Sequence, residues 1–555
     1  MPRIIFPYFL FFTLLCWLTD CRFLHRPPRH DLTPIGENLD NRVQDNIRMQ
    51  LQYGLASRTG SAGTFSQYRL TALERLYSQR DYKALWSENG YLNIPAHTLL
   101  SQVEGADAVG LDPADYFEAS LKALIPATNR KIARRDAAGW ARADILLSEA
   151  CLKLFVQVHF GVLGPDSLSL RKQNTFSDTS LALMVSRGVQ NNILDSMIDS
   201  LEPRYIQFGL LKSALSRYIL QNGKRVWDSL PLNKLDSSGF PDLVASRLVQ
   251  GGELDTADIR HQARIIRALK RFQRTHNLYP DGQAGSQTVE ALNVTAGARI
   301  RQIRINLERW REMPDTLPSC YALVNIPAFG FQLWDNDTLR LQSRVIVGAP
   351  LTPTPQLNSS ILNFQLFPYW RLPMSIVVKE VLPGIKKNKE YLRKFNLQVL
   401  DRHNRIVDSS ALHWNRYSKN YFPYLIRQMT GLDNSLGIIK FNFRNKYSVY
   451  MHDTNARGLF GRQYRALSHG CVRLQQWDSL SRYLVRNDKL RHIEDSLVVW
   501  EKLQVQKQVS LTRRLPFYIR YFTCQVNASG HLIFDQDIYG YDSLQEKQAG
   551  MNLQD

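Results

Sequence analysis

The sequence predicts a multidomain α+β protein in which a helical first half is followed by a mainly-β second half. Apolar residues in the first half recur with the period of an α-helix, and from Tyr321 onward they alternate with polar residues as in a β-strand. The chain has 555 residues, too many for one hydrophobic core. About three or four structural units are therefore expected.

The composition is that of a folded protein with a basic surface. Hydrophobic residues make up 44% of the chain and aromatic residues 11%. Seventy Lys and Arg stand against 50 Asp and Glu, which gives a net charge of +20. A basic surface favours polyanions such as nucleic acid, anionic lipid or an acidic cell-wall polymer. The sequence has no nucleic-acid motif and no basic block interleaved with aromatics, so nucleic acid is not expected as a partner.

Residues 1–21, MPRIIFPYFLFFTLLCWLTDC, predict an export signal. An apolar run over residues 4–19 follows the cationic Arg3. The run is short for a membrane span, which needs about 20 residues, and long enough for a signal-peptide core of about 7–15. We therefore expect the periplasm or cell envelope. The sequence leaves open a cleaved signal, an uncleaved membrane anchor, and a lipid on Cys21, where Asp20 occupies a position that is usually small.

Residues 22–67 are polar and weakly patterned, which predicts a tether. Residues 68–251 then predict a mostly helical domain without a catalytic constellation. Its clearest helix is ARADILLSEACLKLFVQVHFG, whose apolar residues share one face and which ends near Gly161. Cys151 lies beside that face and is expected to be a buried, inert thiol.

The stretch IIRALKRFQRTHNLYPDGQAGSQTVEALN predicts two short helices around a turn. Ile265, Leu269 and Phe272 share one helix face, and Pro280–Gly282 form the turn. The pattern resembles the small three-helix peptidoglycan-binding domain, here over residues 256–295. An ordinary helical hairpin is the alternative.

A mainly-β domain is predicted over residues 319–502. The tripeptide 335–337 reads as a hairpin turn, and YSVYM reads as a strand that runs directly into His452. Residues 375–428 look like an insertion that is helical at its start and rich in Tyr, Trp, Lys and Arg. Residues 510–555 predict two further strands and a short finish that complete this region.

Cysteine usage excludes a disulfide framework and a structural zinc site. Six cysteines are present, of which two lie in the leader, and no C-x-x-C occurs. The four others are spread along the body of the chain. They are Cys151, Cys320, Cys471 and Cys524. Cys524 lies in an apolar strand and is expected in the core.

The stretch ALSHGCVRL makes Cys471 a candidate nucleophile. A thiol is mostly protonated at neutral pH, so a catalytic cysteine needs a base and a positive environment. Gly470 permits a sharp turn in which adjacent backbone N–H groups can face one developing oxyanion. His452, at a predicted strand end 471 − 452 = 19 residues earlier, and His469 are the candidate bases. The alternatives are a buried structural cysteine, or a metal site that would need a fourth ligand.

The pairing of HDT with SHGCVRL resembles the L,D-transpeptidases, cysteine enzymes that remodel peptidoglycan. The segments SRVIVGAPLTPTP, YWRLP, GLDNSLGIIKF, DIYGYD and RADILLSEACLKLFVQVHFG are similar to the large periplasmic members of that family. The resemblance covers about residues 68–542 in the same order. It implies a helical scaffold domain, a peptidoglycan-binding domain, and a mainly-β, YkuD-type catalytic domain with a capping insertion.

The resemblance also implies roles for individual residues. Cys471 would be the nucleophile and His452 the general base, with a pKa near 7. The backbone N–H groups of His469, Gly470 and Cys471 would form the oxyanion hole, and Arg473 would shape or charge the substrate groove.

Three further residues are expected near the substrate. The resemblance implies that Tyr369 and Trp370, together with the insertion, line the cap. Asp453 stands where many small family members have Gly or Ser. Its carboxylate would either orient His452 and raise its pKa or cap the loop that follows, and the sequence leaves both open.

The implied reaction is acyl transfer between peptidoglycan stem peptides, one as donor and one as acceptor. It needs no metal or organic cofactor. Cys471 would form a thioester with release of the terminal D-alanine, an amine of a second stem would complete a 3→3 cross-link, and carbapenems would acylate the cysteine. Transfer to water, transfer to a protein amine, and a non-catalytic peptidoglycan anchor remain alternatives.

Overall fold

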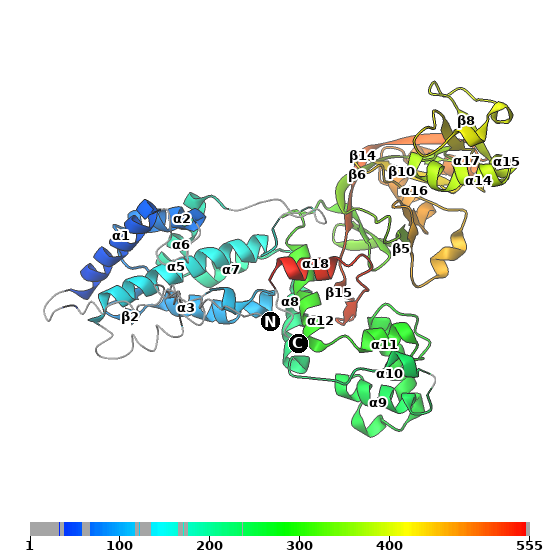
Figure 1. The fold of residues 1–555 in the computed structure, drawn as a ribbon. Helices are drawn as coiled ribbons and strands as arrows, with labels where there is room; N and C mark the ends of the chain where they lie inside the picture. The colour runs from blue at the N-terminus through cyan, green and yellow to red at the C-terminus, as the bar shows by residue number, and fades with distance from the viewer. Residues whose placement is uncertain are drawn as a thin grey trace, which may run out of the picture. The chain divides into compact units, whose positions relative to one another are not determined.

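The computed structural model describes residues 38–57, 67–116, 135–164, 176–235 and 237–550, and in addition Thr33, Leu121 and Leu170. The predicted leader lies outside these residues. No helix among the described residues is long and apolar enough to cross a membrane. The chain forms two compact units (Figure 1). The described residues of the first unit fall within Met1–Ala106, Asp112–Val158 and Thr175–Glu202, and those of the second fall within Asp107–Leu111, His159–Asn174 and Pro203–Asp555.

The first unit is helical, as predicted, and α5 (Ala137–Phe160) contributes more buried residues to its core than any other helix. Cys151 on α5 is fully buried, as expected, and burial raises the pKa of its thiol. The helix ends at Gly161, whose φ is +81°. The other helices are α1 (Leu39–Ser57), α2 (Gln67–Ser78), α3 (Ile94–Glu104), α6 (Asp178–Gln190) and α7 (Leu194–Leu201).

Helix α1 corrects the prediction of a continuous tether over residues 22–67. Val43, Ile47 and Leu51 recur every four residues and are buried. They make one narrow apolar stripe that packs near α2. The helix was not predicted because most residues around this stripe are polar.

A buried polar network explains the hydrophilic residues on α5. The Asp144 carboxylate accepts hydrogen bonds from the backbone N–H of Leu85 at 2.8 Å and of Trp86 at 2.9 Å. It also accepts one from the Tyr77 hydroxyl at 2.6 Å. One turn later, Ser148 accepts a hydrogen bond from the Trp86 indole at 2.7 Å. A buried carboxylate is tolerated here because its oxygens are hydrogen-bonded.

In the second unit, α9 (Phe240–Gly251), α10 (Gln262–Thr275) and α11 (Ser286–Leu292) form a small cluster with a common hydrophobic core (Figure 1). The predicted turn between α10 and α11 is present. Gly282 there has a φ of +81°, and its N–H donates to Gln273 Oε1 at 2.8 Å. The sequence prediction placed α9 in the preceding helical domain, whereas its buried side chains pack with those of α10 and α11.

A second core joins α8 (Ile206–Asn222), α12 (Ala296–Trp310) and the hairpin of β15 (Cys524–Val526) and β16 (Leu532–Phe534). Cys524 is buried in this core, as predicted.

The mainly-β domain contains a nine-stranded sheet in the order β12-β5-β13-β11-β10-β6-β14-β3-β4. Because β5 also pairs with β4, the sheet closes on itself around its hydrophobic core. The strands are β3 (Cys320–Asn325), β4 (Gly330–Asp335), β5 (Thr338–Gly348), β6 (Leu357–Leu366), β10 (Ile439–Phe443), β11 (Met451–His452), β12 (Ala466–Ser468), β13 (Val472–Leu474) and β14 (Lys507–Arg520). Strand β14 lies between β6 and β3, so the segment after residue 502 is an integral part of the sheet.

The hairpin predicted at residues 335–337 is confirmed. Asn336 and Asp337 have φ values of 49° and 57°, which is the left-handed pair that joins two twisted antiparallel strands. The strand predicted over YSVYM is wrong in extent, since β11 holds only Met451 and His452. The Asn445 side chain binds the backbone of Tyr447 and Val449 instead, and this local turn replaces strand pairing.

The insertion forms a separate lobe with its own hydrophobic core. Its helical part is α13 (Met374–Ile376), a π-helical turn (Val377–Val381), α14 (Leu382–Lys387) and α15 (Tyr391–Lys394). It also contains a sheet that the sequence did not predict, in the order β7 (Trp370–Arg371), β9 (Leu425–Gln428), β8 (Leu397–Leu400). Helices α16 (Trp477–Arg486), α17 (Glu494–Lys502) and α18 (Tyr541–Gln548) complete the described chain.

Candidate active site

Three neighbouring strands place one residue each in a row across the sheet. Lys440 on β10 pairs with His452 on β11, and His452 pairs with Arg473 on β13. Paired residues of adjacent strands project to the same face. The residues that alternate with them point into the hydrophobic core; they are Phe441, Met451 and Val472. The face that carries Lys440, His452 and Arg473 is called the site face below.

The next pair on the site face contains the cysteine. Side chains alternate along a strand, so Tyr450 and Cys471, two positions before His452 and Arg473, project to the same face. Val472 N donates to Tyr450 O at 3.1 Å, which fixes this register. The rings of Tyr450 and His452 have their centroids 5.6 Å apart. The register therefore places the predicted nucleophile, directly before β13, and the predicted base, on the neighbouring β11, on the same face of the sheet.

A glycine turn positions Cys471. Gly470 has a φ of +114°, in the region that only glycine adopts readily. The Ser468 hydroxyl accepts from Gly470 N at 3.1 Å and donates to Cys471 O at 2.6 Å. From the facing loop, Thr354 Oγ1 donates to Gly470 O at 2.9 Å and Thr352 Oγ1 donates to Ser468 O at 3.0 Å. The turn is thus held on both sides.

The same turn changes the expected oxyanion hole. The N–H of Gly470 is already bonded to Ser468. Within the described residues, the N–H groups of His469 and Cys471 donate no hydrogen bond. The available backbone donors are therefore those of His469 and Cys471, rather than three consecutive N–H groups.

The groups around the Cys471 thiol shift its pKa in opposite directions. Burial raises the pKa of Cys471, while the backbone and hydroxyl of Tyr450 and the charges of Lys440 and Arg473 lower it. The net pKa lies above the ordinary value of a thiol. The free protein therefore holds Cys471 mainly as the thiol, in a positive environment that favours the thiolate once the proton is removed.

His452 is neutral at physiological pH. Its side chain is buried, and burial together with the charges of Arg473 and Lys440 lowers its pKa to about 3. Backbone groups of Asp453 and Leu436 oppose this shift without reversing it. The sequence analysis expected a pKa near 7, and the difference arises because burial and two cations penalise the imidazolium. Nδ1 of His452 is buried without a hydrogen-bond partner of good geometry, and a neutral imidazole can accept a proton.

The structure favours the loop-capping role for Asp453. Its carboxylate is fully buried and accepts from Ile438 N at 3.0 Å and from Arg457 Nη2 at 2.7 Å. Gly437 allows this approach, because a Cβ there would lie 2.3 Å from Asp453 Oδ2. Among the described contacts, the carboxylate makes no hydrogen bond to the His452 ring, which the other alternative required.

The insertion reaches the site through two contacts. His469 Nε2 lies 2.7 Å from Glu380 Oε1 on the π-helical turn, so the His469 ring is paired with the insertion. The buried indole N–H of Trp370 lies against the Tyr450 hydroxyl. Tyr369 is 38% exposed, and its ring lies under the Arg427 guanidinium at 4.5 Å. Of the two aromatic residues predicted to line the cap, Trp370 is the one that contacts the site.

Sequence reasoning missed three residues near the cysteine: Tyr450, Lys440 and Glu380. Tyr450 stands two residues before His452, so the strand period would have placed it on the site face. Lys440 and Glu380 gave no such signal, because their proximity depends on strand register and on the fold of the insertion.

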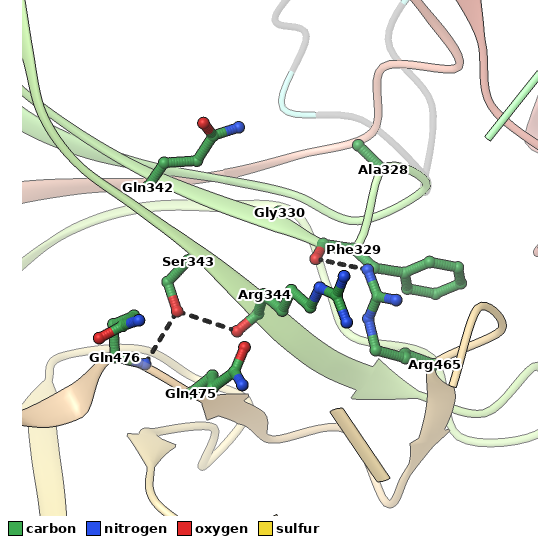
Figure 2. A pocket seen from close by; sticks show the side chains of 9 residues that line it. All are labelled: Ala328, Phe329, Gly330, Gln342, Ser343, Arg344, Arg465, Gln475 and Gln476. Atoms are coloured by element: carbon green, nitrogen blue, oxygen red, sulfur yellow. Dashed lines mark hydrogen bonds between the residues drawn. The ribbon is translucent and has the colours of Figure 1, made fainter. Parts of the chain in front are cut away.

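A cavity of about 370 Å³ lies elsewhere in the β domain, at Ala328–Gly330, Gln342–Arg344, Arg465 and Gln475–Gln476. Figure 2 shows Arg465 donating to the Phe329 carbonyl and the Ser343 hydroxyl linking Arg344 and Gln476. Arg465 also binds the carbonyls of Val345, Arg462 and Gln463. Its guanidinium therefore serves the fold, and none of the predicted site residues lines this cavity.

Metal ligation has no candidate set in the described part of the chain, since no three His, Cys, Asp or Glu side chains converge there.

Comparisons with known proteins define the class of this chain. A sequence model of the L,D-transpeptidase catalytic domain matches residues 320–493, and a model of a scaffold domain matches residues 71–215. The chain thus combines a scaffold domain with an L,D-transpeptidase catalytic domain. These matches support the resemblance to the L,D-transpeptidases that the sequence indicated.

Individual relatives cover only part of the chain. A Haemophilus influenzae protein assigned to the L,D-transpeptidases is 33% identical over 242 residues, which are 44% of this chain and 48% of that protein. The match therefore spans about half of the relative. A crystal structure of an L,D-transpeptidase from Stackebrandtia nassauensis covers 51% of this chain and 91% of its own, with 12% identity and a TM-score of 0.20. That likeness is too low to carry an argument.

Proposed function

We propose that this protein is an L,D-transpeptidase that forms 3→3 cross-links between peptidoglycan stem peptides through a thioester on Cys471. One observation carries the proposal. The proposal is supported by the sheet register of a domain matched by the L,D-transpeptidase model, in which Cys471, directly before β13, and the neutral His452 on β11 lie on one face. A thiol with an adjacent proton acceptor is the arrangement that nucleophilic acyl transfer requires.

In the first half-reaction, His452 accepts the Cys471 proton and the sulfur attacks the carbonyl carbon of the third stem residue. The oxyanion accepts a hydrogen bond from the free N–H of Cys471 and is stabilised by the positive charge of Arg473. The intermediate collapses as the C–N bond breaks, and His452 returns the proton to the departing amine of D-alanine. A thioester on Cys471 remains.

In the second half-reaction, the side-chain amine of another stem attacks the thioester. The amine loses its proton to His452, the new amide forms, and the C–S bond breaks as His452 returns the proton to the Cys471 sulfur. His452 alternates between base and acid in both halves. No metal or organic cofactor takes part in these steps.

The other parts of the chain are consistent with a function at the cell wall. We infer that the cluster of α9, α10 and α11 binds peptidoglycan, and that the N-terminal residues hold the protein in the periplasm or at the membrane by an anchor or a lipid. A second binding module would raise the local concentration of stems at the catalytic domain. The net charge of +20 suits an anionic polymer.

The test incubates disaccharide-tetrapeptide with wild-type protein and with Cys471→Ala, and reads the products by mass spectrometry. Cys320→Ala is the matched control, because Cys320 is the other cysteine among the described residues that is not fully buried. We expect a cross-linked dimer minus one alanine with wild type and with Cys320→Ala, and no product with Cys471→Ala.

Other outcomes would replace the proposal. Tripeptide without dimer would show that water is the acceptor, which makes the protein an L,D-carboxypeptidase. Stems attached to protein amines would show protein-to-wall attachment. If wild type leaves the substrate unchanged and a carbapenem adds no mass to Cys471, the protein is a non-catalytic peptidoglycan anchor.

A further inference from the structure

Lys440 is a half-buried ammonium on the site face that lacks an acidic partner. Within the part of the chain that the structure describes, no carboxylate lies within ion-pairing distance of Lys440. Burial lowers its pKa, and the charge of Cys471 is the interaction that opposes this. A buried cation without a counter-ion is costly. An anion that forms near Lys440 during the reaction would therefore be stabilised by its charge.

The geometry links Lys440 to the cysteine through Tyr450. Lys440 Nζ lies 4.0 Å from the centroid of the Tyr450 ring, which is a close cation–π contact. The Tyr450 backbone and hydroxyl face the Cys471 sulfur. The strand register fixes the position of the Lys440 backbone in this arrangement, because Lys440 pairs directly with His452.

The other charged groups around the sulfur do not supply this counter-ion. His452 on β11 is neutral, since its pKa is about 3. Arg473 on β13 is a second cation, and burial lowers its pKa too. Two carboxylates of the site region have other partners: Asp453 pairs with Arg457, and Glu380 of the insertion pairs with His469. The thiolate of Cys471 is therefore the anion that can form between Lys440 and Arg473.

We propose that Lys440 is a positioning residue that stabilises the Cys471 thiolate, by its charge and by holding the Tyr450 ring against the sulfur. In the resting enzymes of many cysteine hydrolases a charged histidine provides this positive charge, whereas here a lysine and an arginine provide it and leave His452 free to accept protons. The inference deepens the proposed function, but its test reads the thiol itself and not cross-linking.

The experiment measures the rate of Cys471 alkylation by iodoacetamide between pH 5 and 10 in the full-length protein, with the modified peptide identified by mass spectrometry. Lys440→Met removes the charge and keeps an apolar stem, and Lys440→Arg keeps the charge. Lys446→Met is the matched control, because Lys446 also lies over a tyrosine ring, that of Tyr447, at 5.2 Å, but on an exposed loop. Melting temperatures of all variants establish that each is folded.

Loss of the charge should leave the thiol harder to ionise, so the alkylation profile of Lys440→Met should move to higher pH by about one unit. At pH 7 this corresponds to about a tenfold slower reaction. Lys440→Arg and Lys446→Met should stay within about twofold of wild type, by the same relation between charge and thiolate fraction. In tetrapeptide turnover, Lys440→Met should lower kcat by a similar factor with KM nearly unchanged.

The proposal is overturned if the Lys440→Met profile coincides with those of wild type and Lys446→Met, or if Lys440→Arg loses reactivity as fully as Lys440→Met. Should Lys440→Met lose the wild-type melting transition, Lys440→Gln replaces it under the same criteria. A protein that is inactive on tetrapeptide but shows the expected alkylation shift would refute the proposed function and leave this inference standing.

Discussion

Replacing Asp453 with alanine separates two roles that this residue could have beside His452. The structure assigns its carboxylate to the loop, through bonds to Ile438 N and to Arg457. Asp453→Ala should therefore destabilise the β domain while leaving the titration behaviour of the site largely unchanged.

The magnitude follows from those two contacts. The bond from Ile438 N to a buried carboxylate is charge-assisted, and its loss, which leaves a buried N–H unpaired, costs about 2–3 kcal/mol. The pair with Arg457 adds less, at most about 1 kcal/mol, because the Arg457 side chain is 55% exposed and water screens it. The sum is about 3 kcal/mol, which for a domain of this size lowers the melting temperature by about 6–12 °C.

Calorimetry of the full-length protein measures this shift in the transition of the β domain, and Cys471 alkylation against pH measures the site. Asp453→Asn, which keeps one acceptor oxygen, should lie between wild type and alanine. Glu390→Ala is the surface control, since Glu390 pairs with Arg393 on an exposed helix, and it should change stability by less than about 0.5 kcal/mol. An Asp453→Ala protein that melts like wild type but has a shifted alkylation profile would refute the loop-capping assignment.

Two further predictions concern the site. Gly470→Ala forces a side chain into a φ of +114°, which costs about 1–3 kcal/mol; we expect at least a tenfold loss of tetrapeptide turnover with little change in circular dichroism, and full turnover would contradict the role of this turn. The pKa of His452 is about 3 in the folded protein against an ordinary value of 6.5, so the unfolded chain binds the proton first. The stability that neutral His452 contributes is complete above about pH 6.5 and is lost as the pH falls toward 3, by up to about 1.4 kcal/mol per pH unit. His452→Gln should flatten this part of the pH dependence of the melting temperature, and curves that stay parallel would show that other groups cause it.

Short-range sequence patterns correctly predicted local secondary structure. The apolar stripe from residue 143 to residue 158 became α5, and the turn at Asn336 and Asp337 became a left-handed hairpin turn. These features depend on neighbours within a few residues, and the chemistry of those neighbours is written in the sequence. Such patterns fail where a side chain competes with the backbone for hydrogen bonds, as Asn445 does after β10. The strand predicted there contains only the two residues of β11 in the structure.

The sequence by itself determined the L,D-transpeptidase-like catalytic domain, the helical and β-rich halves, and the choice of Cys471 and His452 as candidate nucleophile and base, because these rest on motifs and periodicities that lie along the chain. Only the tertiary structure decided what surrounds that pair. The register of β10, β11 and β13 set Lys440 and Arg473 beside the thiol, and the fold of the insertion brought Glu380 to His469. Burial then moved the pKa of His452 to about 3 instead of the value near 7 that its motif suggested. Electrostatic effects of this kind depend on distance and on exclusion of water, and these exist only once segments distant in sequence have packed together.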